Sequence, residues 1–280
     1  MEELEARLKS PVVARHPLHG GCVADVYLLE LQDGRRVVAK RRSRGDHPSL
    51  ETEAWVLSFL AEKVRLPVPE VISATADLLL MEFVEGEPGL SSLAEEDAAR
   101  WIAALHSVEG KAFGFARTTA IGPLPQDNRW QSSWIAFFRD QRLMPMGRRA
   151  HARGKLSNET LKRLECLCGQ LDRWLEEPPS AALLHGDLWD GNIISRQGRI
   201  AAFLDPASYF GHPEVELAFG TLFGTLKERF FARYAEFRPI APGFFEVRRD
   251  IYNLYPLLVH ATLFGSSYGA AAARILERHV

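Results

Sequence analysis

The amino-acid sequence predicts an α+β protein with a small antiparallel β lobe that contains one helix and a larger, mainly helical lobe. Alternating apolar residues and a hairpin turn at Asp33-Gly34 predict strands in the first third of the chain. Apolar residues at helical spacing dominate the remainder. Glycine and proline interrupt both patterns in residues 85–89. We therefore expect an N-terminal lobe over residues 1–85 and a C-terminal lobe over residues 86–280.

The composition is that of a globular chain without a strong charge bias. Of the 280 residues, 46% are apolar and 25% are charged, and the formal net charge is −2. A chain of this size can bury a large core, and its small net charge argues against a nucleic-acid or membrane-surface partner. Three of the first five residues are glutamates, and no apolar run reaches bilayer length. We expect a cytoplasmic protein that binds neither nucleic acid nor membranes.

The first strands of the N-terminal lobe surround a glycine pair. Strand patterns fill residues 12–31, and a return strand over residues 36–40 ends at Lys40. Gly20 and Gly21 lie between the first two strands. A glycine loop and a strand-end lysine are a means of covering and contacting nucleotide phosphates. The glycine signal is weak by itself, and Lys40 also fits an ordinary lysine that continues into the basic run after it.

The helix that follows predicts a partner for Lys40. Residues 48–63 have a helical pattern that begins at Pro48, and Glu53 lies on or beside its apolar stripe. A carboxylate directed toward a core is costly unless a cation meets it. We therefore expect an ion pair between Lys40 and Glu53 that fixes the ammonium against phosphates. Glu51 is the second candidate, and a Glu53 on the helix surface is the alternative.

Two further strands, over residues 68–72 and 77–84, precede the lobe boundary. The second runs directly into the glycine and proline connection. The backbone of Glu82, Phe83 and Val84 is a candidate contact for an adenine ring, and a plain edge strand with a linker is the alternative.

The C-terminal lobe begins with a capping box, Ser92 to Glu95, that predicts a helix through His106. Residues 108–130 have a loop-like composition. The basic residues 147–155 are expected to form a solvated connection. Further helical patterns begin at Trp130, Ser157 and Glu214.

The residues that carry the chemistry follow an apolar pair at 183–184. His185 and Asp187 are followed by Asn192, and a strand-like run then ends at Asp205. Phosphoryl transfer needs a base that orients a hydroxyl and oxygen ligands for Mg²⁺. The spacing therefore favours Asp187 as base and Asn192 and Asp205 as metal ligands. The same residues also fit a polar turn before an ordinary hairpin, and the lysine and glutamate of the N-terminal lobe decide between the two.

Together with the residues that surround them, these side chains make the sequence resemble the fructosamine/ketosamine 3-kinase family, a branch of the protein-kinase-like fold related to aminoglycoside phosphotransferases. The resemblance covers nearly the whole chain. It is carried by Gly20-Gly21-Cys22, Leu124-Pro125-Gln126-Asp127-Asn128, Trp134 to Phe138, His185 to Trp189, Gly191-Asn192, Asp205 to Glu214, Leu217-Ala218, Tyr252 to Leu258, His260 and Leu263-Phe264-Gly265.

The resemblance implies a kinase that uses ATP and Mg²⁺ and phosphorylates the C3 hydroxyl of a ketosamine. The acceptor would be a ribulosamine, erythrulosamine or fructosamine adduct of a small amine or a protein lysine. Phosphorylation would destabilise the sugar–amine linkage and release the amine, which is a protein deglycation repair activity. The residue roles given above carry over, and Trp189 and His260 would line the sugar pocket. Asp190 stands where the family often has serine.

Cys22 supports a hypothesis of its own. A thiol in a phosphate-covering loop can form a disulfide with the same residue of a second molecule on oxidation. An unreactive small residue in the loop is an equal alternative, and we otherwise expect a monomer. Cys166 and Cys168 are expected to pack as small apolar residues.

Two other functions compete with the ketosamine kinase. A kinase of the same fold acting on an aminoglycoside or choline would be favoured by an acidic, cation-accepting pocket. A nucleotide-binding pseudokinase module is the candidate from another class. The presence of all five predicted nucleotide, metal and catalytic side chains argues against it. These are Lys40, Glu53, Asp187, Asn192 and Asp205.

Overall fold

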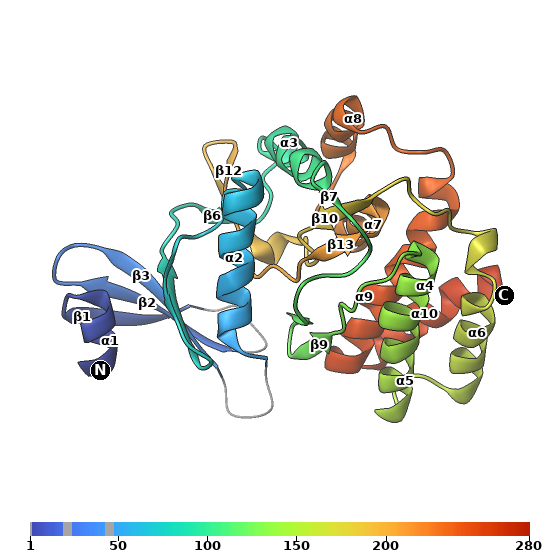
Figure 1. The fold of residues 1–280 in the computed structure, drawn as a ribbon, viewed down its shortest axis with the longest axis horizontal. Helices are drawn as coiled ribbons and strands as arrows, with labels where there is room; N and C mark the ends of the chain where they lie inside the picture. Colours follow the sequence, from blue (N-terminus) through green and yellow to red (C-terminus); the bar gives the residue numbers. More distant parts are fainter. Residues whose placement is uncertain (1, 19–23, 43–47) are drawn as a thin grey trace.

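The computed structural model describes residues 2–18, 24–42 and 48–280 and shows two lobes (Figure 1). In the described part of the N-terminal lobe, five antiparallel strands form a sheet in the order β1-β2-β3-β5-β4. The C-terminal lobe is mainly helical, which confirms the α+β class. The N-terminal elements are α1 (Glu2–Leu8), β1 (Val12–Leu18), β2 (Ala24–Leu31), β3 (Arg36–Arg42), α2 (Leu50–Val64), β4 (Val71–Ala74) and β5 (Leu78–Glu82).

The hairpin between β2 and β3 sets the register of this sheet. Gly34 has a φ of 85°, a left-handed conformation that favours glycine, and its N–H donates to the Leu31 carbonyl at 3.0 Å. The resulting register places Lys40 opposite Val26 on β2 and opposite Leu79 on β5. Lys40 is therefore held in a central strand with neighbours on both sides.

Helix α2 joins the two lobes. It begins two residues later than the pattern predicts, because the Ser49 hydroxyl caps it by accepting from the Glu51 N–H at 3.2 Å, and Pro48 stays outside. One side of the helix buries Leu57 against the sheet, and another side buries Leu60 in the core of the C-terminal lobe. Figure 1 shows α2 standing between the sheet and the helical lobe.

The C-terminal lobe surrounds short sheets with helices. Its first elements are β6 (Glu87–Pro88), α3 (Glu95–His106), β7 (Glu109–Gly110), β8 (Thr119–Ile121), β9 (Leu124–Gln126), α4 (Trp134–Phe138), the π-helix η1 (Arg139–Leu143), α5 (Met144–Ala152), α6 (Asn158–Cys168) and η2 (Leu171–Arg173). The remainder are β10 (Ala181–Leu184), η3 (Asp190–Asn192), β11 (Ile193–Arg196), β12 (Arg199–Phe203), β13 (Tyr209–Gly211), α7 (Pro213–Leu222), α8 (Glu228–Phe237), the π-helix η4 (Phe244–Arg248), α9 (Arg249–Phe264) and α10 (Ser266–His279).

Several local expectations differ from the structure. The helix expected from Trp130 begins at Trp134, because the Ser133 hydroxyl caps it by accepting from the Ala136 N–H at 3.1 Å. Helix α3 lacks the predicted capping box, because Glu95 is buried and accepts from the Phe230 N–H at 3.3 Å instead. The loop-like residues 108–130 contain the short strands β7, β8 and β9. The basic residues 147–155 lie largely in α5, where Gly147 is so close to Leu164 of α6 that a Cβ would meet its side chain at 2.2 Å.

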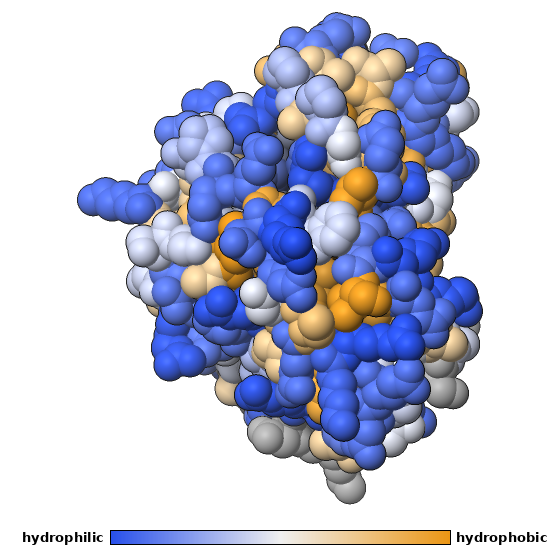
Figure 2. Space-filling view, turned by 90° about the vertical axis from the view of Figure 1, so that its right-hand side faces the viewer, coloured by the Kyte–Doolittle hydropathy of each residue, from blue (hydrophilic) through white to orange (hydrophobic). Residues whose placement is uncertain are grey.

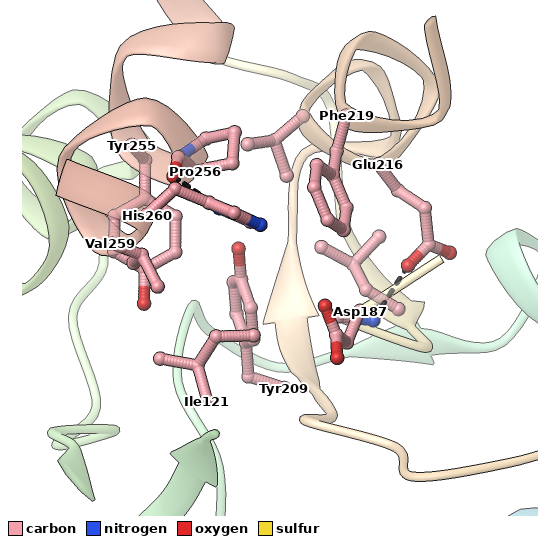
Figure 3. A pocket seen from close by; sticks show the side chains of 12 residues that line it. Ile121, Asp187, Tyr209, Glu216, Phe219, Tyr255, Pro256, Val259 and His260 are labelled. Atoms are coloured by element: carbon pink, nitrogen blue, oxygen red, sulfur yellow. Dashed lines mark hydrogen bonds between the residues drawn. The ribbon is translucent and has the colours of Figure 1, made fainter. Parts of the chain in front are cut away.

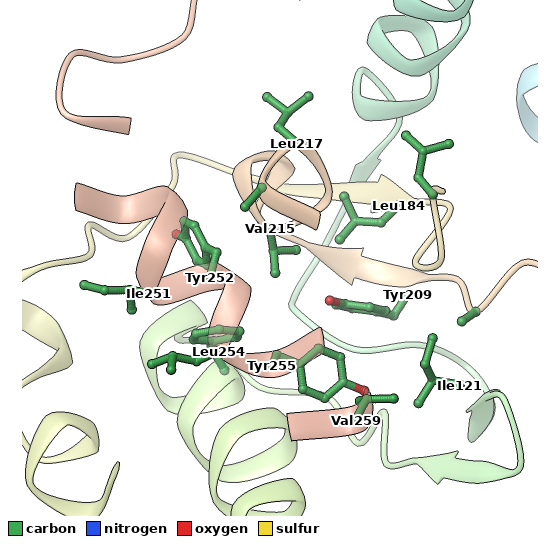
Figure 4. Packing of buried hydrophobic residues seen from close by; sticks show 14 of the residues in the cluster. Ile121, Leu184, Tyr209, Val215, Leu217, Ile251, Tyr252, Leu254, Tyr255 and Val259 are labelled. Atoms are coloured by element: carbon green, nitrogen blue, oxygen red, sulfur yellow. The ribbon is translucent and has the colours of Figure 1, made fainter. Parts of the chain in front are cut away.

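The core of the C-terminal lobe gathers around α9. Figure 4 shows Tyr252 and Tyr255 of α9 packed with Val215 of α7 and with the strands β10 and β13. This packing surrounds the strand β10 that leads into the predicted catalytic loop. Cys168 is buried as expected, whereas Cys166 is exposed.

The surface is largely polar. Figure 2 shows a face covered mainly by hydrophilic residues, where hydrophobic residues reach the surface in small groups. Within the described residues, no helix combines the length and the apolar character needed to span a membrane.

Candidate active site

A fully buried strand leads into the predicted catalytic loop, residues 185–192. Strand β10 pairs with β7 and β13, and its last residue is followed by His185, Gly186 and Asp187. Gly186 has a φ of 88°, and a Cβ there would lie 2.2 Å from the Ala207 carbonyl oxygen. Only glycine allows this close approach. The chain can therefore turn sharply and present Asp187 at the end of the strand.

Asp187 is oriented by Asn192. The Asn192 side-chain amide donates to the Asp187 carboxylate at 2.8 Å and to the Asp187 backbone carbonyl at 2.9 Å. Burial is the main cause that raises the pKa of Asp187 to about 7; the carboxylates of Asp205 and Glu216 add to the shift, and the Asn192 hydrogen bond opposes it. A carboxyl group with such a pKa suits proton transfer near neutral pH.

Glu216 of α7 holds the backbone of the same loop, although no motif in the sequence points to it. Its carboxylate accepts from the N–H groups of His185 at 3.1 Å and Gly186 at 2.6 Å, and it lies 2.9 Å from the His106 ring. Burial raises the pKa of Glu216, but the bonds from His106 and Gly186 outweigh it and keep the pKa low. One feature of the sequence could have predicted its role: Glu216 is an acidic residue in an apolar helix. A buried carboxylate needs hydrogen-bond donors around it.

Lys40 bridges the two lobes. Its ammonium lies 2.8 and 2.9 Å from the two oxygens of Glu53 and 3.0 Å from Asp205. Burial lowers the pKa of Lys40, but the carboxylates of Asp205 and Glu53 outweigh it, so the pKa is raised and the ammonium keeps its charge. Glu51, the second candidate, is exposed and near the Ser49 cap. The structure thus brings Lys40, Glu53 and Asp205 together.

The oxygen groups of Asn192 and Asp205 fit a magnesium ion. Asp205 has a φ of 50° directly after the β11–β12 hairpin, and its carboxylate is partly exposed. Asn192 uses its amide nitrogen for Asp187, which leaves its oxygen available. In the described ranges no cluster of three or more His, Cys, Asp or Glu could hold a metal. Mg²⁺ needs few protein ligands where phosphates supply the remainder, so this donor set is sufficient.

The predicted adenine contact lies where β5 leaves the sheet. Glu82 is the last residue of β5, and the Phe83 N–H donates to the Arg36 carbonyl at 3.4 Å. The Arg36 guanidinium lies 4.5 Å from the centre of the Phe83 ring, and Val84 is half-buried. The other predicted nucleotide residues, Gly20 and Gly21, and the candidate redox residue Cys22 lie outside the described residues.

A pocket beside Asp187 is a candidate acceptor site (Figure 3). Its enclosed volume is about 30 Å³, and the hollow reaches about 420 Å³ when the part open to solvent is counted. His260, predicted to contact the sugar, is among its lining residues. The wall consists of Ile121, Leu184, Gly186, Asp187, Tyr209, Val215, Glu216, Phe219, Tyr255, Pro256, Val259 and His260.

Trp189 and Asp190 lie in the part of the catalytic loop that follows Asp187. Trp189 is 40% exposed and covers Gly191, but it is not among the described residues that line this pocket. The Asp190 carboxylate accepts from the Leu90 N–H at 3.1 Å, and the Asp190 N–H donates to the Thr225 hydroxyl at 3.0 Å. Asp190 therefore anchors the chain after the lobe boundary to the catalytic loop.

Comparisons with known proteins identify relatives along the whole chain. The model of the fructosamine kinase family matches residues 2–280. A protein named as a probable ketoamine kinase from Synechocystis sp. is 31% identical over 276 residues, covering 94% of this chain and 89% of the relative. The chloroplastic protein-ribulosamine 3-kinase of Oryza sativa subsp. indica is 31% identical over 271 residues, covering 93% and 77%.

Solved structures agree with this assignment. A crystal structure assigned as a fructosamine-3-kinase from Thermobifida fusca superimposes with a TM-score of 0.87 at 32% identity, covering 99% of this chain and 98% of the other. An aminoglycoside phosphotransferase in complex with AMP-PNP and hygromycin B has a TM-score of 0.70 at 16% identity, covering 100% and 98%. The second likeness shows the fold alone.

Proposed function

Since the chain belongs to the fructosamine kinase family, we propose that it transfers the γ-phosphoryl group of ATP to the C3 hydroxyl of a ketosamine. The protein is an ATP-dependent kinase of the ketosamine 3-kinase type. The residue roles, the sugar and the amine are the parts of this function that we infer.

The observation that carries the proposal is the position of Asp187. It lines the candidate acceptor pocket and accepts a hydrogen bond from the Asn192 amide nitrogen, which leaves the Asn192 side-chain oxygen for a metal ion. A hydroxyl in the pocket can therefore donate to Asp187 while its oxygen faces the nucleotide. As the hydroxyl oxygen bonds to the γ-phosphorus and ADP departs, Asp187 accepts the hydroxyl proton.

Charge compensation comes from residues of both lobes. Lys40, fixed by Glu53, would contact the phosphates of ATP, and Asn192 and Asp205 would hold Mg²⁺. When bound, the metal ion supplies positive charge to the phosphate oxygens. The backbone of Glu82 to Val84 would contact the adenine, with Gly20 and Gly21 covering the phosphates. His260 would contact the acceptor inside the pocket, and Trp189, which lies outside the pocket lining, would contact the sugar from the exposed part of the loop.

The acceptor would be a ribulosamine, erythrulosamine or fructosamine, either free or on a protein lysine. Phosphorylation of its C3 hydroxyl would weaken the sugar–amine linkage, which makes the activity a deglycation repair. We also propose a monomer in the cytoplasm, supported by the balanced composition and by three cysteines in no disulfide framework.

The test is ATP consumption in the presence of Mg²⁺ with each of the three ketosamines, with aminoglycosides and choline as competing acceptors. The Asp187→Asn variant is the blank. Turnover of a ketosamine by the wild-type protein alone is the expected result. Activity confined to an aminoglycoside or choline would overturn the acceptor and keep the kinase chemistry.

A further inference from the structure

Aromatic rings surround His260 at one end of the acceptor pocket. The centre of its imidazole lies 4.9 Å from the ring centre of Phe223, 5.1 Å from Tyr268, 5.4 Å from Phe264 and 6.3 Å from Phe219. We call these four rings the aromatic platform. They come from the end of α7, from α9 and from α10, so the fold brings together residues that are far apart in the sequence.

The platform leads from the pocket to the surface. Phe219 is buried and lines the pocket together with His260, whereas Phe223 is 40% exposed and Phe264 is 53% exposed. Two residues beyond Phe223, the Thr225 hydroxyl accepts from the catalytic loop at 3.0 Å. Phe223 and Phe264 are among the exposed large hydrophobic residues, so part of each ring is accessible to a bound molecule.

His260 presents a hydrogen-bond acceptor to this space. Its Nδ1 lies 2.8 Å from the Pro256 carbonyl oxygen, and because a carbonyl can only accept, Nδ1 carries the proton. Burial lowers the pKa of His260, so the ring is neutral near pH 7 and Nε2 has a free lone pair. Figure 3 shows the ring directed into the pocket toward Phe219 and Tyr209.

The charges of the pocket match a cationic ligand. Among the described residues that line it there is no lysine or arginine, and its two ionisable acids are Asp187 and Glu216. Aromatic faces attract cations within about 6 Å of the ring centre. The centres of all four platform rings lie within 6.3 Å of the centre of the imidazole that carries Nε2.

We propose that the aromatic platform and His260 Nε2 bind the protonated amine of the acceptor, so that the site selects a secondary ammonium over a neutral analogue. The inference rests on the proposed ketosamine kinase function. The amine of a ketosamine is separated from the C3 carbon by only two carbon atoms. His260 and Asp187 both line the pocket, so the proposal places the ammonium at the first and the C3 hydroxyl at the second.

The first experiment compares a ketosamine with its N-acetylated, uncharged analogue, using wild-type protein and the variants Phe223→Leu and Phe264→Leu. Leucine keeps apolar area but removes the π face. We expect kcat/KM for the cationic acceptor to fall by roughly 2- to 30-fold in the variants, with little change for the neutral analogue. Phe245→Leu, another exposed phenylalanine outside the platform, is the matched control and should change neither.

An equal loss for both acceptors, or no loss for either, would overturn the inference. A binding measurement separates it from the proposed function: calorimetry with an N-alkyl-1-amino-polyol, which carries the ammonium but no keto group. Weaker binding by Phe223→Leu than by Phe245→Leu supports the platform even if no ketosamine is phosphorylated. Equal binding by the two variants, or no binding by the wild-type protein, contradicts it.

Discussion

The Glu216 carboxylate accepts a hydrogen bond from the backbone N–H of Gly186 at 2.6 Å, immediately before the proposed catalytic base. The carboxylate is itself fixed by His106, whose other ring nitrogen lies 2.7 Å from the Tyr234 hydroxyl. All of these side chains are buried. The catalytic loop is therefore attached through its backbone to α3, α7 and α8.

This attachment predicts the effect of Glu216→Ala. Two backbone donors and one ring donor lose their acceptor, and each unsatisfied buried group costs about 1–3 kcal/mol. We expect a lower melting temperature and a kcat reduced by at least roughly tenfold, because Asp187 is no longer held in place. Steady-state kinetics and thermal unfolding measure both quantities.

The control is Glu214→Ala in the same helix. Glu214 is also buried and pairs with Arg248 at 2.6 Å, but it does not contact the catalytic loop. The Glu214→Ala variant should also have a lower melting temperature. For the same decrease in melting temperature, its kcat should fall much less than that of Glu216→Ala. Equal losses of kcat in the two variants would mean that Glu216 acts only through stability.

Asp187→Asn tests the base directly. The substitution removes the proton acceptor but keeps the size of the side chain. We expect kcat to fall by roughly two to four orders of magnitude with a modest change in the KM for ATP. Asp190→Asn is the matched control, because its amide oxygen can still accept from Leu90, and its kcat should stay within a few fold of the wild type. Unchanged turnover in Asp187→Asn would remove Asp187 from the role of base.

The pH dependence follows from the pKa of Asp187, which burial raises to about 7. A base must be ionised, so kcat/KM for the acceptor should fall tenfold per pH unit below about 7. The raised pKa of Asp187 also affects stability, which should decrease with rising pH whereas activity increases. The folded protein holds this proton up to about pH 7 and the unfolded chain only to about pH 4, so stability from this group is lost as the pH rises between those values.

Thermal unfolding of wild type and Asp187→Asn from pH 5 to pH 8 measures that loss. The asparagine has no proton to lose, so the variant should gain stability relative to the wild type as the pH rises. Parallel curves for the two proteins would show that Asp187 has an ordinary pKa.

Local spacing was enough to predict some of these residues, and long-range packing explains why others were missed. Asp187 and Asn192 are five residues apart and meet within one turn, so the sequence pattern contains their contact. Lys40 and Glu53 could be paired because a charge on an apolar helix stripe needs a partner. Glu216 contacts residues 30 and 31 positions away, and His106 is 110 positions away, so no periodicity reveals them. The contacts between His260 and the rings around it also depend on the packing of different helices, so they could not be predicted from the sequence pattern either.

Arg142 supports the wall of the acceptor pocket. It is completely buried and lies 4.1 Å from the ring centre of Tyr209 and 5.7 Å from that of Tyr255, both of which line the pocket. Its guanidinium also donates to the Asp127 carbonyl at 2.7 Å and to the Asn128 side-chain oxygen at 2.6 Å. The planar group thus stacks and forms several hydrogen bonds at once.

Arg142→Lys should therefore raise the KM for the acceptor by roughly three- to tenfold and leave the KM for ATP nearly unchanged, because an ammonium cannot replace the planar, forked guanidinium. Steady-state kinetics with each substrate varied in turn would measure this. Arg139→Lys, three residues earlier in the same π-helix and paired with Asp140 on the surface, is the control and should change neither constant. A rise in both KM values for Arg142→Lys would mean that the guanidinium supports the whole lobe rather than the pocket wall.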